Sequence, residues 1–187
     1  MTEPAGPAAL ARWINEPSSW RIADGAVVVS VEPGTDFWRT THYGFVRDTG
    51  HLLAVAEPGD FVATVEVSAD YRDRYDQAGL AVRLDAEHWV KTGIELDGEF
   101  FMSTVVTHGT SDWSVTPLAA RPERLGLRVT RDGDALTVEY AVDGGEWTMQ
   151  RLAWMPAEVP LLVGPMAAAP DGAGFEARFT GWSVVRS

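Results

Sequence analysis

The chain has 187 residues, 45% of them hydrophobic and 22% charged, so it can bury a full core without disulfides and does not have a disordered composition. Its net charge of -12 argues against nucleic acid and anionic membrane as partners, because both would repel it. The absence of cysteine excludes a disulfide framework, thiol catalysis and cysteine-ligated zinc. No secretory signal pattern and no apolar run of about 18 residues occurs, so we expect a cytoplasmic protein.

Residues 1–9, rich in proline, alanine and glycine, predict a flexible leader, and residues 10–187 predict one domain. Along that domain, short runs of alternating apolar and polar residues are separated by turn dipeptides such as Asp24-Gly25. No segment shows a helical period bounded by caps. The runs expected as strands are 10–15 (or a short helical turn), 20–23, 26–31, 52–56, 61–68, three within 75–113, 115–118, 125–130, 135–142, 147–152, 161–168 and 175–185. This pattern is typical of an all-β sandwich or jelly roll with antiparallel pairing.

The most informative stretch is 75–113, where turns at 85–87 and at Asp97-Gly98 separate three strands. A period of two sorts its side chains onto two faces. The predicted core face carries Leu80, Val82, Leu84, Val90 and Ile94. The opposite face carries Gln77, Gly79, Ala81, Arg83, Trp89, Lys91, Gly93 and Glu95. This mixture of small, charged and aromatic residues differs from an ordinary solvated face, so we expect it to line a cleft.

Six short pieces in order along residues 36–114 carry a resemblance to a known family. They are Asp36-Phe37-Trp38, Gly59-Asp60-Phe61, residues 75–80 (YDQAGL), 89–95 (WVKTGIE), 103–107 (STVVT) and 111–114 (SDWS). In these pieces the chain resembles the regulation-of-enolase protein family, a domain of unknown function in the concanavalin A-like lectin/glucanase superfamily. The resemblance implies a jelly-roll sandwich of two antiparallel sheets with one concave face, on which members of the wider superfamily bind or cleave carbohydrate. A shared fold does not by itself supply a function.

Polar residues on the proposed concave face are candidates for grasping a polar ligand. Lys91 and Glu95 share that face but lie four residues apart, roughly 13 Å at ~3.3 Å per residue, so they cannot pair directly. Arg83 or Gln77 on the neighbouring strand is the natural partner of Glu95. The alternative is an exposed ladder of salt bridges between strands, which would contribute little.

Three tryptophans, Trp38, Trp89 and Trp113, could converge on the cleft, where an exposed indole stacks on the apolar face of a sugar ring. For Trp38 and Trp113 a core position stays equally open. For four further tryptophans we expect the core: Trp20, Trp147, Trp154 and Trp182.

Asp36 and Asp112 could accept hydrogen bonds from ligand hydroxyls or could cap turns. His42 and His108 adjoin matched pieces and are candidates for ligand contact or proton transfer, the alternative being exposed strand ends. The four histidines lack metal-ligand spacing, so we predict no metal site and no cofactor.

The sequence Glu95-Leu96-Asp97-Gly98-Glu99 has the Glu-x-Asp-x-Glu spacing of laminarinase-like glucanases. Retaining hydrolysis requires two carboxyl groups ~5 to 5.5 Å apart, which positions i and i+4 of a regular strand do not provide. The Asp97-Gly98 turn signal would also end the strand before Glu99. We therefore disfavour a glucanase.

The sequence favours recognition of a carbohydrate or sugar-derived metabolite on the concave face of a lectin-like sandwich, noncatalytic or regulatory. The expected ligand-binding residues are Asp36, Trp38, His42, Gln77, Arg83, Lys91, Glu95, Asp112 and Trp113. One alternative is an enzyme acting on a small polar substrate in the same cleft, with Glu95 or His108 as acid or base. A second is a protein-interaction module whose partner covers the concave face.

Overall fold

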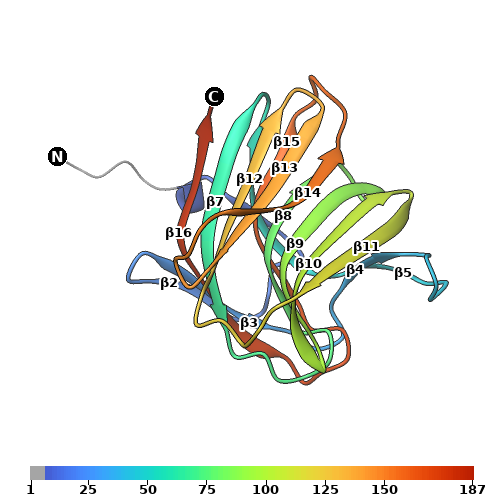
Figure 1. Cartoon of the computed structure of the whole chain (residues 1–187), viewed down its shortest axis with the longest axis vertical. Helices are drawn as coiled ribbons and strands as arrows, with labels where there is room; N and C mark the ends of the chain where they lie inside the picture. Colours follow the sequence, from blue (N-terminus) through green and yellow to red (C-terminus); the bar gives the residue numbers. More distant parts are fainter. Residues whose placement is uncertain (1–6) are drawn as a thin grey trace.

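The computed structural model describes residues 7–187, and its regular structure consists of strands apart from one short 3₁₀ turn, η1 (Pro7–Ala9). Ala8 in this turn packs against the core, while residues 1–6 of the expected leader lie outside the described residues. Two large antiparallel sheets of seven strands each pack against each other, which confirms the predicted sandwich of two antiparallel sheets (Figure 1). Among residues 7–187, no helix is long and apolar enough to cross a membrane.

We call the first sheet the front sheet. Its strands, in spatial order, are β1 (Arg12–Ile14), β6 (His51–Glu57), β15 (Leu161–Ala168), β8 (Gln77–Arg83), β9 (His88–Asp97), β10 (Glu99–His108) and β11 (Thr110–Pro117). The back sheet has the order β14 (Thr148–Trp154), β13 (Ala135–Val142), β12 (Leu125–Asp132), β7 (Phe61–Ala69), β16 (Phe175–Arg186), β3 (Ala26–Val31) and β2 (Trp20–Ala23). Neighbours such as β15 and β8 are distant in sequence, so the sheets are not simple meanders.

The main core lies between the two sheets and follows the predicted period of two. Val90 and Ile94 from β9 and Leu80 and Val82 from β8 point into it. In β12 buried residues alternate with half-exposed ones, because the outer face of the back sheet meets solvent. In β8 every residue is buried, so the outer face of the front sheet is covered as well.

That cover is a small separate hairpin of β4 (Phe37–Arg39) and β5 (Val46–Asp48), which projects beside the edge of the front sheet near β11 (Figure 1). It forms a second apolar cluster with the outer face of the front sheet. The cluster contains Phe37, Trp38, Leu52, Ala54, Ala81, Trp89, Val105 and Met166. Trp89 therefore lies on the predicted face, but it is buried under the hairpin.

Two turn predictions around the central strands are confirmed. β8 ends at Arg83 and β9 begins at His88, which leaves the predicted turn at 85–87 between them. β9 ends at Asp97, Gly98 has a φ of 73°, and β10 begins at Glu99. The Glu-x-Asp-x-Glu spacing therefore bends around a hairpin instead of running along one strand.

The prediction that four tryptophans belong to the core is wrong for three of them. Trp20, Trp147 and Trp154 are 36%, 42% and 54% exposed. They lie at the ends of β2 and β14, the two edge strands of the back sheet, or just before β14. Only Trp182 packs partly buried against the main core.

Candidate functional site

A cavity of about 220 Å³ lies between the outer face of the front sheet, the β4–β5 hairpin and two loops. We call it the concave-face cavity. Its lining residues are Asp36, Trp38, Tyr43, Phe45, Arg47, Arg74, Tyr75, Gln77, Lys91, Glu95, Val105, Trp113, Pro170 and Asp171. Six of the nine predicted ligand-binding residues are among them: Asp36, Trp38, Gln77, Lys91, Glu95 and Trp113.

A buried ion pair lies on one side of the cavity. The Nζ of Lys91 on β9 is 3.2 Å from Oδ1 of Asp36, just before β4. The same Asp36 oxygen accepts the backbone N–H of Phe37 at 2.8 Å. Lys91 and Asp36 are only 4% and 7% exposed, so the pair is shielded from water. Lys91 is also the single lysine of the chain.

Glu95 lies four residues after Lys91 on the same face of β9 and is 6% exposed. It accepts a hydrogen bond from the indole N–H of Trp113 at 3.1 Å, and that N–H also donates to the Ser103 hydroxyl at 2.9 Å. Burial raises the pKa of Glu95, against the opposing effects of Lys91 and of the hydrogen bonds from Ser103 and Trp113. A carboxyl group in this state can accept a hydrogen bond or, when protonated, donate one.

Aromatic side chains form the wall that faces these polar groups. The rings of Trp38 and Trp113 meet edge to face with centroids 6.4 Å apart, and Tyr43 packs on Trp38 at 5.5 Å. The ring of Tyr75 also packs edge to face on that of Trp113, with centroids 6.3 Å apart. Because Trp38 is buried and donates its N–H to the Thr41 carbonyl at 3.0 Å, it supports the wall more than it offers a free face.

The hydroxyls of Tyr43 and Tyr75 lie 3.2 Å apart and link the hairpin to the loop before β8. Partial burial and this hydrogen bond raise the pKa of Tyr75 to about 12. Several residues at this end of the cavity have left-handed backbones, namely Thr40, His42, Gly44 and Tyr75, with φ between 63° and 74°. For the three residues other than Gly44 this conformation is strained, and such positions persist where the surrounding structure fixes them.

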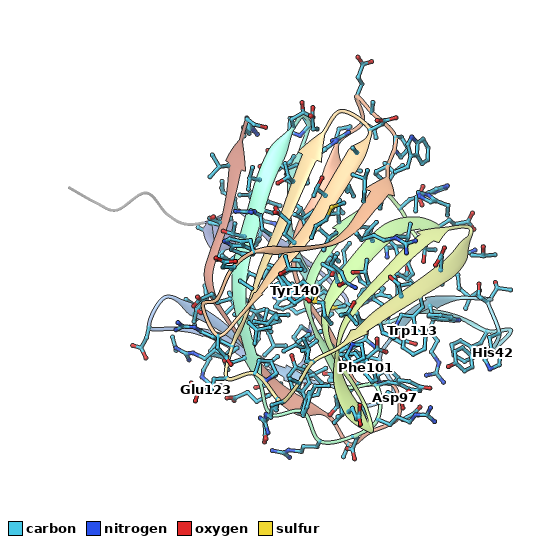
Figure 2. The ribbon with its side chains drawn as sticks, viewed as in Figure 1. His42, Asp97, Phe101, Trp113, Glu123 and Tyr140 are labelled. Atoms are coloured by element: carbon cyan, nitrogen blue, oxygen red, sulfur yellow. The ribbon has the colours of Figure 1, made fainter. Side chains whose placement is uncertain are left out.

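Two other predicted ligand-binding residues, His42 and Asp112, lie just outside the concave-face cavity. His42 and Asp112 line a shallower depression that shares Trp38, Tyr43, Arg74, Tyr75 and Trp113 with the cavity. Figure 2 shows His42 at the outer end of the hairpin, beyond Trp113. Asp112 is exposed and pairs with Arg151 at 3.4 Å.

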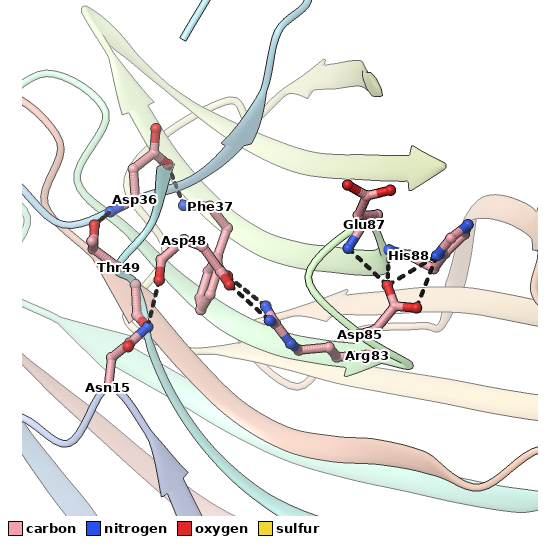
Figure 3. Close-up of polar contacts among 10 residues, drawn as sticks. Asn15, Asp36, Phe37, Asp48, Thr49, Arg83, Asp85, Glu87 and His88 are labelled. Atoms are coloured by element: carbon pink, nitrogen blue, oxygen red, sulfur yellow. Dashed lines mark hydrogen bonds and ion pairs between the residues drawn. The ribbon is translucent and has the colours of Figure 1, made fainter. Parts of the chain in front are cut away.

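Arg83 and His108 are farther away. Arg83 makes a two-pronged ion pair with Asp48 of β5, with one contact of 2.8 Å, and does not line the cavity (Figure 3). His108, at the turn between β10 and β11, donates from Nε2 to the Trp154 carbonyl at 3.0 Å. The structure therefore does not bring Arg83 or His108 together with Glu95.

Eight lining residues were not predicted: Tyr43, Phe45, Arg47, Arg74, Tyr75, Val105, Pro170 and Asp171. The aromatic and basic composition of residues 35–51 was a signal for the first three. The other five come from separate loops and from β10, which only the tertiary fold brings together. Within residues 7–187, no group of three or more His, Asp or Glu is arranged to hold a metal ion.

These features define a lectin-like β-sandwich with one small, partly enclosed cavity on its concave face. The chain belongs to the family described as protein of unknown function (DUF1349), whose model matches residues 13–187. It is 42% identical over 174 residues to "Regulation of enolase protein 1" of Saccharomyces cerevisiae, covering 92% of this chain and 88% of the relative. The family resemblance drawn from the sequence is confirmed.

Among solved structures, the fold is similar to a functionally unknown protein from Saccharomyces cerevisiae, with a TM-score of 0.92, 40% identity and coverage of 96% of this chain and 98% of that one. It is also similar to the carbohydrate binding module CBM66 from Bacillus subtilis, with a TM-score of 0.59, 11% identity and coverage of 92% and 94%. A third match is the GH43 protein BlXynB from Bacillus licheniformis, with a TM-score of 0.70, 14% identity and coverage of 92% and 36%. At these low identities the last two matches show the fold alone.

Proposed function

We propose that the protein recognises a small sugar or sugar-derived metabolite in the concave-face cavity. The observation that carries the proposal is an aromatic wall, Tyr43, Tyr75 and Trp113, set against a buried polar side, Asp36, Lys91 and Glu95. A sugar has both an apolar C–H face, which packs on aromatic rings, and hydroxyls, which pair with charged groups. The similarity of the fold to a carbohydrate binding module supports this choice.

The size of the cavity limits the ligand. Clefts for drug-sized ligands occupy roughly 300–1,000 Å³. A volume of about 220 Å³ therefore suits a ligand of about one sugar ring, not a polysaccharide chain. The neighbouring depression around His42 and Asp112 would leave room for a substituent at the outer end.

Thermal-shift measurements against monosaccharides, oligosaccharides, sugar phosphates and sugar acids test the proposal. A ligand at a hundred times its Kd stabilises by about 2.7 kcal/mol, which raises the Tm by several degrees. Trp113→Phe keeps a ring but removes the N–H that holds Glu95, so we expect it to reduce the shift given by a ligand. Trp147→Phe, an exposed tryptophan before β14, is the matched control and leaves the shift unchanged. If no sugar shifts the wild type, the proposal is wrong and a protein partner becomes the better hypothesis.

The burial of Glu95 favours a second candidate, an enzyme acting on a small polar substrate with Glu95 as acid or base. A raised pKa brings a carboxyl group closer to neutral pH, where proton transfer is most effective. Glu95→Gln separates the two functions. For a pure binding protein, the variant changes affinity and no chemical conversion of the ligand occurs in either form. For an enzyme, wild type converts the ligand and Glu95→Gln binds it without conversion.

A further inference from the structure

Three cationic side chains, Arg47, Arg74 and Lys91, line the concave-face cavity of a chain whose net charge is -12. They come from β5, from the loop before β8 and from β9, so the fold gathers them from distant parts of the sequence. Because the chain as a whole is strongly acidic, a cavity with as many cations as carboxylates differs in charge from its surroundings.

The carboxylates of the cavity are already accounted for. Lys91 neutralises Asp36 at 3.2 Å. Glu95 is buried and accepts a hydrogen bond from the indole N–H of Trp113 at 3.1 Å. Asp171 is exposed on the loop after β15, where water solvates it. Two of the three carboxyl groups are therefore engaged by side chains of the protein, and the third lies in solvent.

The two arginines differ from each other. Arg74 donates to Asp97 at 2.7 Å and stacks over the Tyr75 ring, so its charge is largely balanced. Arg47 is partly buried, and its guanidinium carbon lies over the Phe45 ring, 4.5 Å from the ring centroid, in a cation–π contact. Within residues 7–187, Arg47 takes part in no ion pair and no side-chain hydrogen bond. Of the three cations that line the cavity, Arg47 is therefore the one that has no carboxylate partner among the described residues.

We propose that the ligand is an anionic sugar derivative whose carboxylate or phosphate is bound by Arg47, while its ring lies against the aromatic wall. The inference rests on the proposed sugar recognition and adds the charge of the ligand to it. A planar guanidinium presents a fork of N–H donors that matches the two oxygens of a carboxylate or phosphate. Its stacking on Phe45 holds that fork in place before the ligand arrives, which lowers the entropy lost on binding.

The test compares matched ligands by isothermal titration calorimetry. Glucose, galactose and mannose are compared with their 6-phosphates and with glucuronate, galacturonate and mannuronate, and inorganic phosphate is included as a probe of its own. We expect the wild type to bind at least one anionic derivative roughly tenfold or more tighter than the parent sugar, a difference of about 1.4 kcal/mol. Comparing the sugar phosphates with the sugar acids shows whether the anionic group that binds is a phosphate or a carboxylate. The affinity for the anionic ligand should also fall with added salt.

Arg47→Gln is the decisive variant, because it keeps a hydrogen-bonding side chain and removes the charge. We expect it to abolish the preference, so that the anionic derivative and the parent sugar bind with Kd values within about twofold of each other. Arg128→Gln is the matched control, since Arg128 also stacks on an aromatic ring, Trp147, at 4.4 Å, but on the back sheet. Circular dichroism of each variant confirms folding.

Each other result overturns the inference. Equal binding of neutral and anionic sugars, unaffected by Arg47→Gln, leaves sugar recognition standing and refutes the role of Arg47. If the preference for anionic sugars survives in Arg47→Gln, a cation other than Arg47 binds the anionic group. Binding of inorganic phosphate as tight as that of any sugar phosphate refutes both the sugar and its anionic derivative as ligands. The absence of binding across the panel refutes the proposed function and this inference together.

Discussion

The Nζ of Lys91 lies 3.2 Å from Oδ1 of Asp36, and this buried pair joins residues 55 positions apart. Lys91 belongs to the middle of the front sheet, and Asp36 leads directly into the β4–β5 hairpin. The pair therefore ties the hairpin to the sheet at the point where the concave-face cavity is formed. Its removal should affect both the stability of the fold and the shape of the cavity.

Lys91→Met is expected to destabilise the protein by about 3–5 kcal/mol, because it leaves the Asp36 carboxylate buried without its cation. Urea denaturation of Lys91→Met, Asp36→Asn and the double variant measures the coupling. We expect the double variant to be more stable than Lys91→Met alone, since neither charge then remains. Equal effects of Lys91→Met in both backgrounds would show that the two side chains do not interact.

Glu95→Gln should stabilise the protein at neutral pH but not in acid. Burial raises the pKa of Glu95 above its ordinary 4.5, so the wild type loses stability as pH rises from about 4.5 through the folded pKa. Glutamine has no such loss. The Tm of Glu95→Gln relative to wild type should therefore increase as pH rises from about 4.5 to about 8. Each kcal/mol of difference in the free energy of unfolding corresponds to roughly 2–4 °C.

Glu139→Gln provides a control of opposite sign for that experiment. The hydrogen bond from Arg128 lowers the pKa of Glu139, so the wild type gains stability as pH rises through the folded pKa toward the ordinary value. The Tm of Glu139→Gln relative to wild type should therefore fall as pH rises through the acidic range. If both variants followed the same trend with pH, the burial of Glu95 would not explain the first result.

Gly93→Ala should disrupt the sheet under the cavity. Gly93 lies opposite Gly79 in the β8–β9 pair, and a Cβ at Gly93 would stand 2.1 Å from the Ala78 carbonyl oxygen. The two strands would have to separate, at a cost of about 1–3 kcal/mol or more. Gly126→Ala in β12 is the control, because its Cβ would meet nothing nearer than 3.4 Å. Urea denaturation should show a clear loss for the first and little change for the second.

Tyr43→Phe should lower the pKa of Tyr75 from about 12 without returning it to 10.0. Desolvation is the larger cause of the raised pKa and persists in the variant, whereas the hydrogen bond that the Tyr75 hydroxyl donates to the Tyr43 hydroxyl is lost. Carbon-13 NMR of the tyrosine Cζ atoms follows the Tyr75 signal alone. Tyr140→Phe on the back sheet should leave that signal's titration unchanged. An unaltered Tyr75 titration in Tyr43→Phe would mean that the two hydroxyls are not bonded in solution.

The period of two was sufficient to assign faces within the central strands. It placed Val90 and Ile94 in the main core and Lys91 and Glu95 on the opposite face, as the structure shows. The sandwich class followed from the regular spacing of turn dipeptides. These properties are local, because side-chain alternation and turn chemistry depend on neighbours in sequence.

The cover of the concave face could not be predicted in the same way. The β4–β5 hairpin buries Trp89 and pairs Asp48 with Arg83 across 35 positions of sequence, so Arg83 turns away from the cavity. The insertion of β15 between β6 and β8 brings Pro170 and Asp171 to the rim. Strand order and hairpin docking depend on long-range packing, which a period within one strand does not encode.

The single lysine of the chain gives the folded protein an unusual surface chemistry. Lys91 is 4% exposed, whereas the remaining basic side chains are arginines. A lysine-specific protease thus has one cleavage site, in the middle of β9, and cannot reach it while the front sheet is intact. Cleavage between residues 91 and 92 would therefore report the opening of the sandwich itself, because a surface fluctuation that leaves β9 in place does not expose this bond to the protease.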